Sequence, residues 1–411
     1  MACSRHFIKT PQLHTVPRPI RVASDFLRKT VKLLYFLVDR SDMKSTNSSE
    51  ASAEQPSVTW LLSVKNSMPF LRETLESIHC QTYKNHKLLV WDDCSTDGTL
   101  EELERWIPNR IPGKIFSGRS LRLGPSLAFL VEQADTELCA RIDGDDVNLP
   151  HRLERQVAFM QANPAVGVLG SLTAHIDENG THAPAWGYPI LDADIRWRSR
   201  WQPSLCHPTV MFRRSAVLAA GNYRDFQVED FDLWMRMSLL TEFHNLPEPL
   251  VQYRRYSASL TGEVDDFYPL ERKTASLNAG VLFINTADPA KAVALWSATH
   301  PYRAEQPNFS FSPFHALRAY RSIQQLRNEA IELARHVGKE DNYFTGSDFF
   351  KEQRYILRRR ILQSYGPLKM LRLPAAAFLH RRKQPKPERP VIELRAKSVA
   401  QDLPSKSGAS L

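Results

Sequence analysis

Three apolar segments in the first half of the chain each end in a cluster of polar side chains and are each followed by a segment with helical periodicity. The apolar segments are Val58–Val64, Lys87–Trp91 and Glu137–Ile142, and their polar clusters are Lys65-Asn66, Asp92-Asp93 and Asp143 to Asp146. Strands that alternate with helices at this spacing predict a parallel sheet with right-handed crossovers. The carboxyl ends of such strands meet at one edge, where open α/β sheets bind ligands. We therefore expect the three clusters to line one crevice.

The third cluster is the most acidic and lies within A-R-I-D-G-D-D-V-N-L-P, residues 140–150. Asp143, Asp145 and Asp146 would repel one another when all are ionised, and a divalent cation removes that repulsion. Oxygen ligands suit Mg²⁺ or Mn²⁺. A solvated acidic turn is the alternative, so this motif has to be judged together with the rest of the chain.

The second cluster opens the segment D-D-C-S-T-D-G-T-L-E-E-L-E, which matches much of a calcium-loop pattern. An EF-hand needs a helix before its loop, whereas a strand is predicted here, so the calcium interpretation is disfavoured. Asp93 at the strand end can instead accept hydrogen bonds from a nucleotide base or ribose. Ser95 or Asp97 is expected to cap the helix that follows.

Three further sites carry groups that can take part in chemistry. Arg141 lies two residues before Asp143 and can pair with a carboxylate or with a ligand. Glu229-Asp230 begins an aromatic helix, where acidic side chains stabilise the helix end but can also serve as a general base. His207 begins a predicted strand, His207–Phe212, and is expected to titrate near neutrality.

The charge balance favours anionic partners and a reducing compartment. Lys and Arg number 54 against 45 Asp and Glu, which gives a net charge of +9. Phosphates, nucleic acid or acidic lipid would complement that charge. The five cysteines form no C-x-x-C pair, which argues against zinc and for the cytoplasm. No stretch is apolar enough to predict a membrane span.

The pattern changes along the chain predict four regions. We expect a basic N-terminal arm and linker over 1–56, a catalytic α/β domain over 57–262, a helical basic extension over 263–383 and a disordered tail over 384–411. Within the second region, the aromatic, turn-rich segment 174–204 suits a substrate-facing insertion.

The extension is strongly basic between Lys351 and Lys383, where ten Lys and Arg residues face a single acid, Glu352. Interleaved apolar residues make this segment amphipathic, and such a helix can lie on an anionic membrane. A solvated face packed on the catalytic domain is the competing interpretation. Nucleic acid is not expected as a partner, because no recognised binding motif is present.

Five segments, in order, make the chain resemble a family 2 glycosyltransferase between about residues 57 and 261. They are S-V-T-W-L-L-S-V-K-N with L-R-E-T-L-E-S-I-H-C-Q-T-Y, L-L-V-W-D-D-C-S-T-D-G-T, A-R-I-D-G-D-D-V-N-L-P-H-R-L-E-R-Q, H-P-T-V-M-F-R-R-S and V-E-D-F-D-L-W-M-R-M. The resemblance implies the GT-A fold, a Rossmann-like, mostly parallel sheet flanked by helices, here with a helical C-terminal extension.

The resemblance also implies roles for single residues. Asp93 would contact the base of the donor, Asp143 the ribose or the metal, Asp145 would be the metal ligand of a D-x-D motif, and Asp230 would be the catalytic base. Donor binding is further expected of Arg141, with support from Glu229, His207, Asn66 and Arg254. The reaction implied is inversion at a sugar by one in-line displacement, with Mn²⁺ or Mg²⁺ neutralising the departing diphosphate.

The implied partners are a nucleotide-sugar donor and a glycan or lipid-linked acceptor in surface polysaccharide assembly, in the cytoplasm or at the cytosolic face of a membrane. Two positions depart from the family pattern: Ser63 replaces a frequent proline, and Tyr256 stands where a histidine is common. Arg254 or Arg255 would compensate electrostatically. A nucleotidyltransferase acting on sugar phosphates and a non-catalytic nucleotide- or glycan-binding protein are the alternatives.

Overall fold

The structure is a computed structural model that describes residues 55–183, 187–256, 267–286, 288–300 and 313–365. The basic arm predicted over 1–56 lies outside the described residues except for its last two, and the tail predicted over 384–411 lies outside them altogether.

Four parallel strands form the first half of the sheet, in the spatial order β3-β2-β1-β4. These strands are β1 (Val58–Val64), β2 (His86–Asp92), β3 (Gly113–Ser117) and β4 (Leu138–Ile142). Because β1 is covered on both faces, its sequence V-T-W-L-L-S-V is nearly continuous in apolar residues. The predicted parallel order and crossovers are confirmed.

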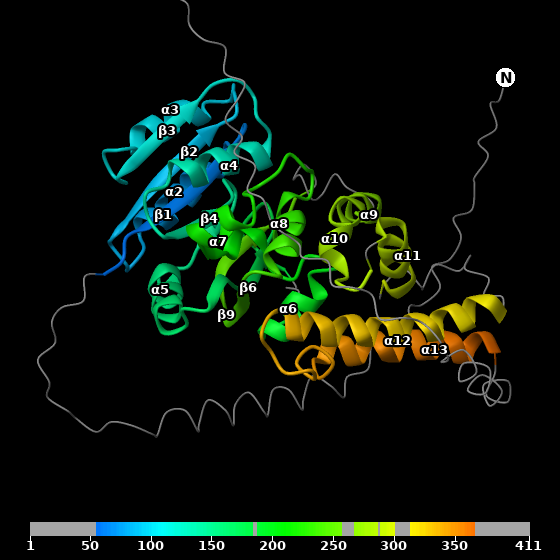
Figure 1. The fold of residues 1–411 in the computed structure, drawn as a ribbon. Helices are drawn as coiled ribbons and strands as arrows, with labels where there is room; N and C mark the ends of the chain where they lie inside the picture. Colours follow the sequence, from blue (N-terminus) through cyan, green and yellow to red (C-terminus); the bar gives the residue numbers. More distant parts are fainter. Residues whose placement is uncertain (1–54, 184–186, 257–266, 287, 301–312, 366–411) are drawn as a thin grey trace, which may run out of the picture. The chain divides into compact units, whose positions relative to one another are not determined.

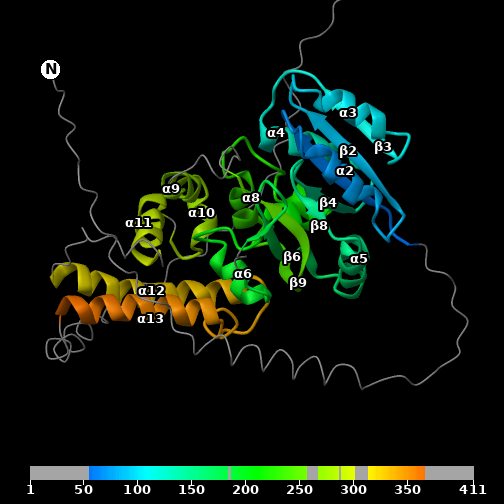
Figure 2. The same cartoon turned by 180° about the vertical axis from the view of Figure 1, so that it is seen from behind.

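Helices cover both faces of this half-sheet, as Figures 1 and 2 show. Trp60 and Leu62 of β1 pack in one core with α2 (Leu71–His79), α3 (Thr99–Trp106) and α5 (Arg152–Ala162). Leu61 points to the opposite face and packs in a second core with α4 (Leu123–Gln133), α7 (Arg214–Ala219) and α8 (Glu229–Met237). Alternate residues of a strand point to opposite faces, so one strand holds both layers together.

The second half of the sheet is mixed. It contains β5 (Val147–Asn148), β6 (Val166–Ile176), β7 (His182–Ala183), β8 (Met211–Arg213) and β9 (Glu242–Arg254). Strand β8 lies antiparallel between β4 and β6, whereas β9 runs parallel to β6. The strand predicted at His207 starts later, because residues 207–209 form a 3₁₀ turn and Pro208 has no N–H to donate to a ladder.

The C-terminal helices build a separate core against α6 (Asp192–Arg198) and one side of α8. These helices are α9 (Tyr268–Leu277), α10 (Ala279–Leu282), α11 (Pro289–Thr299), α12 (Pro313–His336) and α13 (Asp348–Tyr365). Helices α12 and α13 lie side by side in both views of the molecule (Figures 1 and 2). The predicted helical extension is thus present over its described residues.

The aromatic segment predicted to face substrate has a different role in its described part. Trp197 and Trp201 are completely buried. Their indole N–H groups donate to Gln353 Oε1 at 3.2 Å and to Thr299 Oγ1 at 3.2 Å. These two tryptophans join the catalytic half to the extension, so the prediction that they face substrate was wrong. The aromatic density of the segment reflects a helix-packing surface.

Candidate functional site

The acidic loop follows β4 directly, and carboxylate oxygens of Asp143, Asp145 and Asp146 lie within 4.8 Å of one another. Gly144 is required in this loop, since a Cβ there would come within 2.8 Å of Ser67 Oγ. Burial, together with the charge of Asp143, raises the pKa of Asp145 to about 6. Burial also raises the pKa of Asp146, with the charges of Asp145 and Asp143 adding to the effect. The loop holds carboxylates at a separation that favours protonation unless positive charge is supplied.

The acidic loop fits a divalent cation by its donor set. Asp146 is fully buried and, among the described residues, its Oδ2 has no hydrogen-bond partner. Asp143 and Asp145 are partly exposed beside it. Hard oxygen donors of this kind are what Mg²⁺ and Mn²⁺ prefer.

Arg141 pairs with Asp143 through both guanidinium nitrogens and both carboxylate oxygens. Its side chain is buried, whereas that of Asp143 keeps 29% exposure. A bidentate pair of this kind fixes the plane of the carboxylate. Arg141 therefore fixes the orientation of the Asp143 carboxylate.

Arg254 attaches the end of β9 to the same loop. Its backbone N–H donates to Asp146 Oδ1 at 2.8 Å, and its Nε donates to the Asp145 carbonyl at 2.8 Å. Its Nη2 lies 2.5 Å from Glu73 Oε2. Tyr256, two residues on, makes a side-chain hydrogen bond to Asp145. Tyr256, which stands where the family often has a histidine, thus contacts Asp145, the candidate metal ligand. The charge of Arg254 is paired with that of Glu73.

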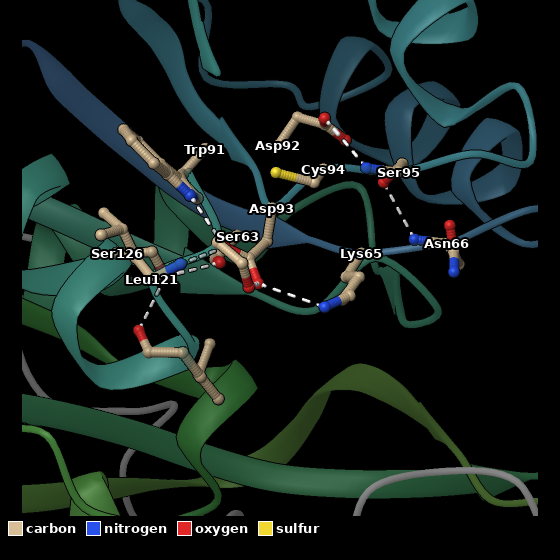
Figure 3. Close-up of polar contacts among 12 residues, drawn as sticks. Ser63, Lys65, Asn66, Trp91, Asp92, Asp93, Cys94, Ser95, Leu121 and Ser126 are labelled. Carbon is tan, nitrogen blue, oxygen red and sulfur yellow. Dashed lines mark hydrogen bonds and ion pairs between the residues drawn. The ribbon is translucent and has the colours of Figure 1, made fainter. Parts of the chain in front are cut away.

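Asp93 is held at the end of β2 by four protein groups, which Figure 3 shows in part. It accepts from the Leu121 backbone N–H at 2.5 Å, from Ser120 Oγ at 2.6 Å and from Trp91 Nε1 at 3.3 Å, and Lys65 Nζ lies 3.7 Å away. Burial opposes ionisation, but these hydrogen bonds and Lys65 hold the pKa of Asp93 below its usual value. Asp93 is therefore an ionised acceptor that positions the loop before α4.

Asn66 and Asp97 shape the loops around Asp93. Asn66 adopts a left-handed backbone conformation with φ of 51° and is exposed. Its backbone N–H donates to Ser95 Oγ at 2.9 Å (Figure 3), and its Oδ1 accepts from the Thr96 N–H at 2.9 Å. Asp97 accepts from the Thr99 backbone N–H at 3.1 Å. Asp97 thus accepts from the first residue of α3, but the N-cap position is Gly98, so neither Ser95 nor Asp97 is the N-cap that was predicted.

Glu229 and Asp230 begin α8, and His207 lies against them. His207 Nδ1 is 3.3 Å from Glu229 Oε1, and its Nε2 is 2.9 Å from Tyr223 Oη. Burial, aided by the charge of Arg141, lowers the pKa of His207 to about 3, so the expected titration near neutrality was wrong. Burial raises the pKa of Glu229 to about 7 and also raises that of Asp230.

The structure brings the predicted residues together in two groups. The first group is the acidic loop, with Asp143, Asp145 and Asp146, together with Arg141 and Arg254. Arg141 also acts electrostatically on Glu229, Asp230 and His207 at the start of α8. Asp93 and Asn66 form the second group. Strand β1 lies between β2, which ends before Asp93, and β4, which ends before the acidic loop.

Sequence reasoning missed two contributors to these groups, Tyr223 and Ser120. Each reaches its partner through tertiary packing across the sheet or between loops, and neither belongs to a chemical motif. Lys65 was expected near the crevice as part of the polar cluster that follows β1, and its Nζ lies 3.7 Å from Asp93. No spacing in the sequence indicates Tyr223.

Comparison with known proteins matches this arrangement to a family. The family model Glycosyl transferase family 2 matches residues 59–219. The protein EpsE of Bacillus subtilis (strain 168) is 29% identical over 290 residues, which cover 68% of this chain and 98% of EpsE. The amylovoran biosynthesis glycosyltransferase AmsE of Erwinia amylovora is 33% identical over 188 residues, which cover 45% of this chain and 70% of AmsE.

Among solved structures, Staphylococcus aureus TarS 1-349 in complex with UDP-GlcNAc aligns with 75% of this chain and 93% of its own, at 18% identity and a TM-score of 0.49. The range matched by the family model runs from β1 to α7 and includes the acidic loop. This chain belongs to glycosyl transferase family 2.

Proposed function

We propose that this protein transfers a sugar from a nucleotide-diphosphate donor to a hydroxyl acceptor with inversion, in the assembly of a surface polysaccharide or glycan. The observation that carries the proposal is the placement of two clusters of carboxylates near Arg141. One cluster is the acidic loop after β4, and the other is Glu229-Asp230 at the start of α8. One group suits cation and diphosphate binding, and the other suits proton removal. The relationship to AmsE, a polysaccharide biosynthesis enzyme by name, favours the pathway.

Asp145 and Asp143 would hold Mn²⁺ or Mg²⁺, as the shared carboxylate cluster and the unpartnered oxygen of Asp146 favour. The bound cation would neutralise charge on the departing diphosphate. Donor binding is assigned to Asp93, Arg141 and Asp143, with Asp93 toward the base. Asn66 supports this side through the loop that it shares with Ser95.

Asp230 is the proposed general base. It is partly exposed at the helix start, whereas Glu229 beside it is buried against His207. With its ring neutral, His207 can donate from Nδ1 to Glu229 and accept at Nε2 from Tyr223. This arrangement occupies Glu229 and leaves Asp230 to take the proton of the acceptor hydroxyl.

The acceptor is proposed to be a glycan or a lipid-linked glycan, met at the cytosolic face of a membrane by a peripherally bound enzyme. No helix in the described part of the chain is long and apolar enough to cross a bilayer. Contact with lipid would then come through the basic extension, whose segment from 366 onward lies outside the described residues.

Thermal melting in the presence of a panel of nucleotide sugars tests the proposal. We expect one donor to raise the melting temperature only with Mn²⁺ or Mg²⁺, and Asp145→Asn to lose that response. If no nucleotide sugar stabilises the wild-type protein with either ion, the catalytic proposal fails. Release of pyrophosphate in place of a nucleoside diphosphate would instead favour the nucleotidyltransferase alternative.

A further inference from the structure

Helices α12 and α13 present a cluster of arginines that the proposed chemistry does not use. We define the guanidinium patch as Arg327 of α12 with Arg354 and Arg358 of α13. Arg354 and Arg358 are four residues apart and therefore share a helix face. Tyr355, on the same side of α13, keeps 64% of its side chain exposed. Helices α12 and α13, which carry these residues, lie side by side (Figures 1 and 2).

The patch arginines differ from Arg335 and Lys351 of the same two helices, which have acidic partners. Arg335 pairs with Asp341 at 2.6 Å, and Lys351 pairs with Asp348 at 3.0 Å. Among the side chains that the structure describes, none of the three patch arginines forms an ion pair. Partial burial and the charges of Arg358 and Arg327 lower the pKa of Arg354, which places the three cations within electrostatic reach.

Unpaired like charges on adjacent helices repel one another, so their proximity favours a bound anion. A guanidinium presents several N–H donors in a plane that matches phosphate oxygens. The exposed Tyr355, three residues before Arg358 and so its neighbour on the helix surface, suits the boundary between water and lipid headgroups. Guanidinium groups carried by two adjacent helices complement an array of phosphates.

We infer that the guanidinium patch is the surface through which this protein docks on an anionic phospholipid bilayer. The inference deepens the proposed peripheral location by naming the face, and it rests on that part of the proposed function alone. Lipid phosphate is the proposed binding partner because the patch is exposed and extends over two helices. Binding should weaken with added salt, because exposed charges are screened.

Vesicle cosedimentation of the full chain tests the inference, with phosphatidylcholine alone or mixed in equal parts with phosphatidylglycerol. Binding should require phosphatidylglycerol. The variant R327Q/R354Q/R358Q should bind on the order of 100-fold more weakly, because it removes three basic residues that each make the typical contribution near an anionic surface. The matched control R105Q/R155Q/R335Q removes the same charge from exposed arginines that are paired with Glu102, Glu248 and Asp341, and it should lose much less.

Two results would overturn the inference. Equal loss in the patch variant and the control would show that net charge alone drives binding. Patch-dependent binding to an RNA duplex without binding to anionic vesicles would assign the surface to nucleic acid. Donor stabilisation measured on the same patch variant separates this inference from the catalytic proposal, because the patch is remote in sequence from the site residues and donor binding should persist.

Discussion

At the residue scale, Asp230 carries the most demanding assignment. Replacing it with Asn keeps the shape of the side chain but removes the basic oxygen. We expect Asp230→Asn to lower the rate of transfer by on the order of 10² to 10⁴-fold, the usual contribution of a general base. Donor affinity, measured by titration calorimetry with the metal present, should stay close to that of the wild type. Loss of donor binding would refute the role of Asp230 as base.

Glu229 gives a prediction on stability and pH. The folded protein holds a proton on Glu229 up to a pKa of about 7, whereas the unfolded chain releases it near 4.5. The folded state therefore binds more protons between these values, and the free energy of unfolding contributed by Glu229 falls as pH rises through that window. As pH rises from 5 to 8, the free energy of unfolding of Glu229→Gln should therefore increase by roughly 2 to 3 kcal/mol relative to that of the wild type.

Urea unfolding of wild type and Glu229→Gln at both pH values measures this difference. His207 acts in the opposite direction, since its pKa falls from 6.5 to about 3 on folding and its contribution to stability rises with pH. Both proteins retain His207, so its own pH dependence largely cancels in the difference, which reports Glu229 together with its effect on Asp230. Parallel pH dependences would contradict the buried, protonated state of Glu229.

His207 also shows the limit of prediction at this scale. The family resemblance assigned His207 a supporting role, and the structure places its ring against Glu229. Its charge state could not be inferred, because burial and the nearby Arg141 are products of tertiary packing. The sequence specifies the chemical type of a side chain, whereas the pKa of that side chain depends on the completed fold.

At the element scale, α9 of the extension supports the helix that bears Asp230. Asn278, which follows α9 directly, donates from Nδ2 to Asp232 Oδ1 at 2.7 Å. Asp232 is completely buried and also pairs with Arg236 at 2.6 Å. The buried polar contact therefore joins the extension to α8 just beyond Asp230.

Removing that contact should destabilise the protein without any change in the site's own side chains. Asn278→Ala leaves a buried oxygen of Asp232 short of a donor, which typically costs about 1 to 3 kcal/mol. Urea unfolding of Asn278→Ala measures the cost, and the exposed Asn328→Ala on α12 is the control, with little change expected. Equal stability of Asn278→Ala and wild type would show that α9 does not support α8 in this way.

The elements themselves were largely predictable up to β4. Strands β1, β2 and β4 are largely apolar on both faces, and each helix begins beside a polar loop, so periodicity and turn residues agree. The aromatic segment that contains Trp197 and Trp201 was misjudged because aromatic side chains suit a ligand surface and a buried helix contact equally. Only the extension, which supplies Gln353 and Thr299 as partners, decides between them.

At the scale of the whole molecule, the sequence predicted the sheet, its flanking helices and the helical extension, and these are confirmed. The five ordered motifs also predicted the family. The second half of the sheet was less predictable, because the 13-residue β9 contains two prolines and pairs with β6 through register shifts. The link between α8 and the extension depends on contacts between segments distant in sequence, which local patterns do not encode.

The acidic loop and Asp230 are proposed to catalyse, together, sugar transfer from a nucleotide-diphosphate donor. Phosphorus NMR of the purified protein with a stabilising donor, an acceptor glycan and Mn²⁺ or Mg²⁺, followed by chromatography, tests this proposal. We expect release of a nucleoside diphosphate matched by glycosylated acceptor, abolished by removing the cation and by either Asp145→Asn or Asp230→Asn. Full product formation without a divalent cation, or undiminished activity in Asp145→Asn, would refute the proposal.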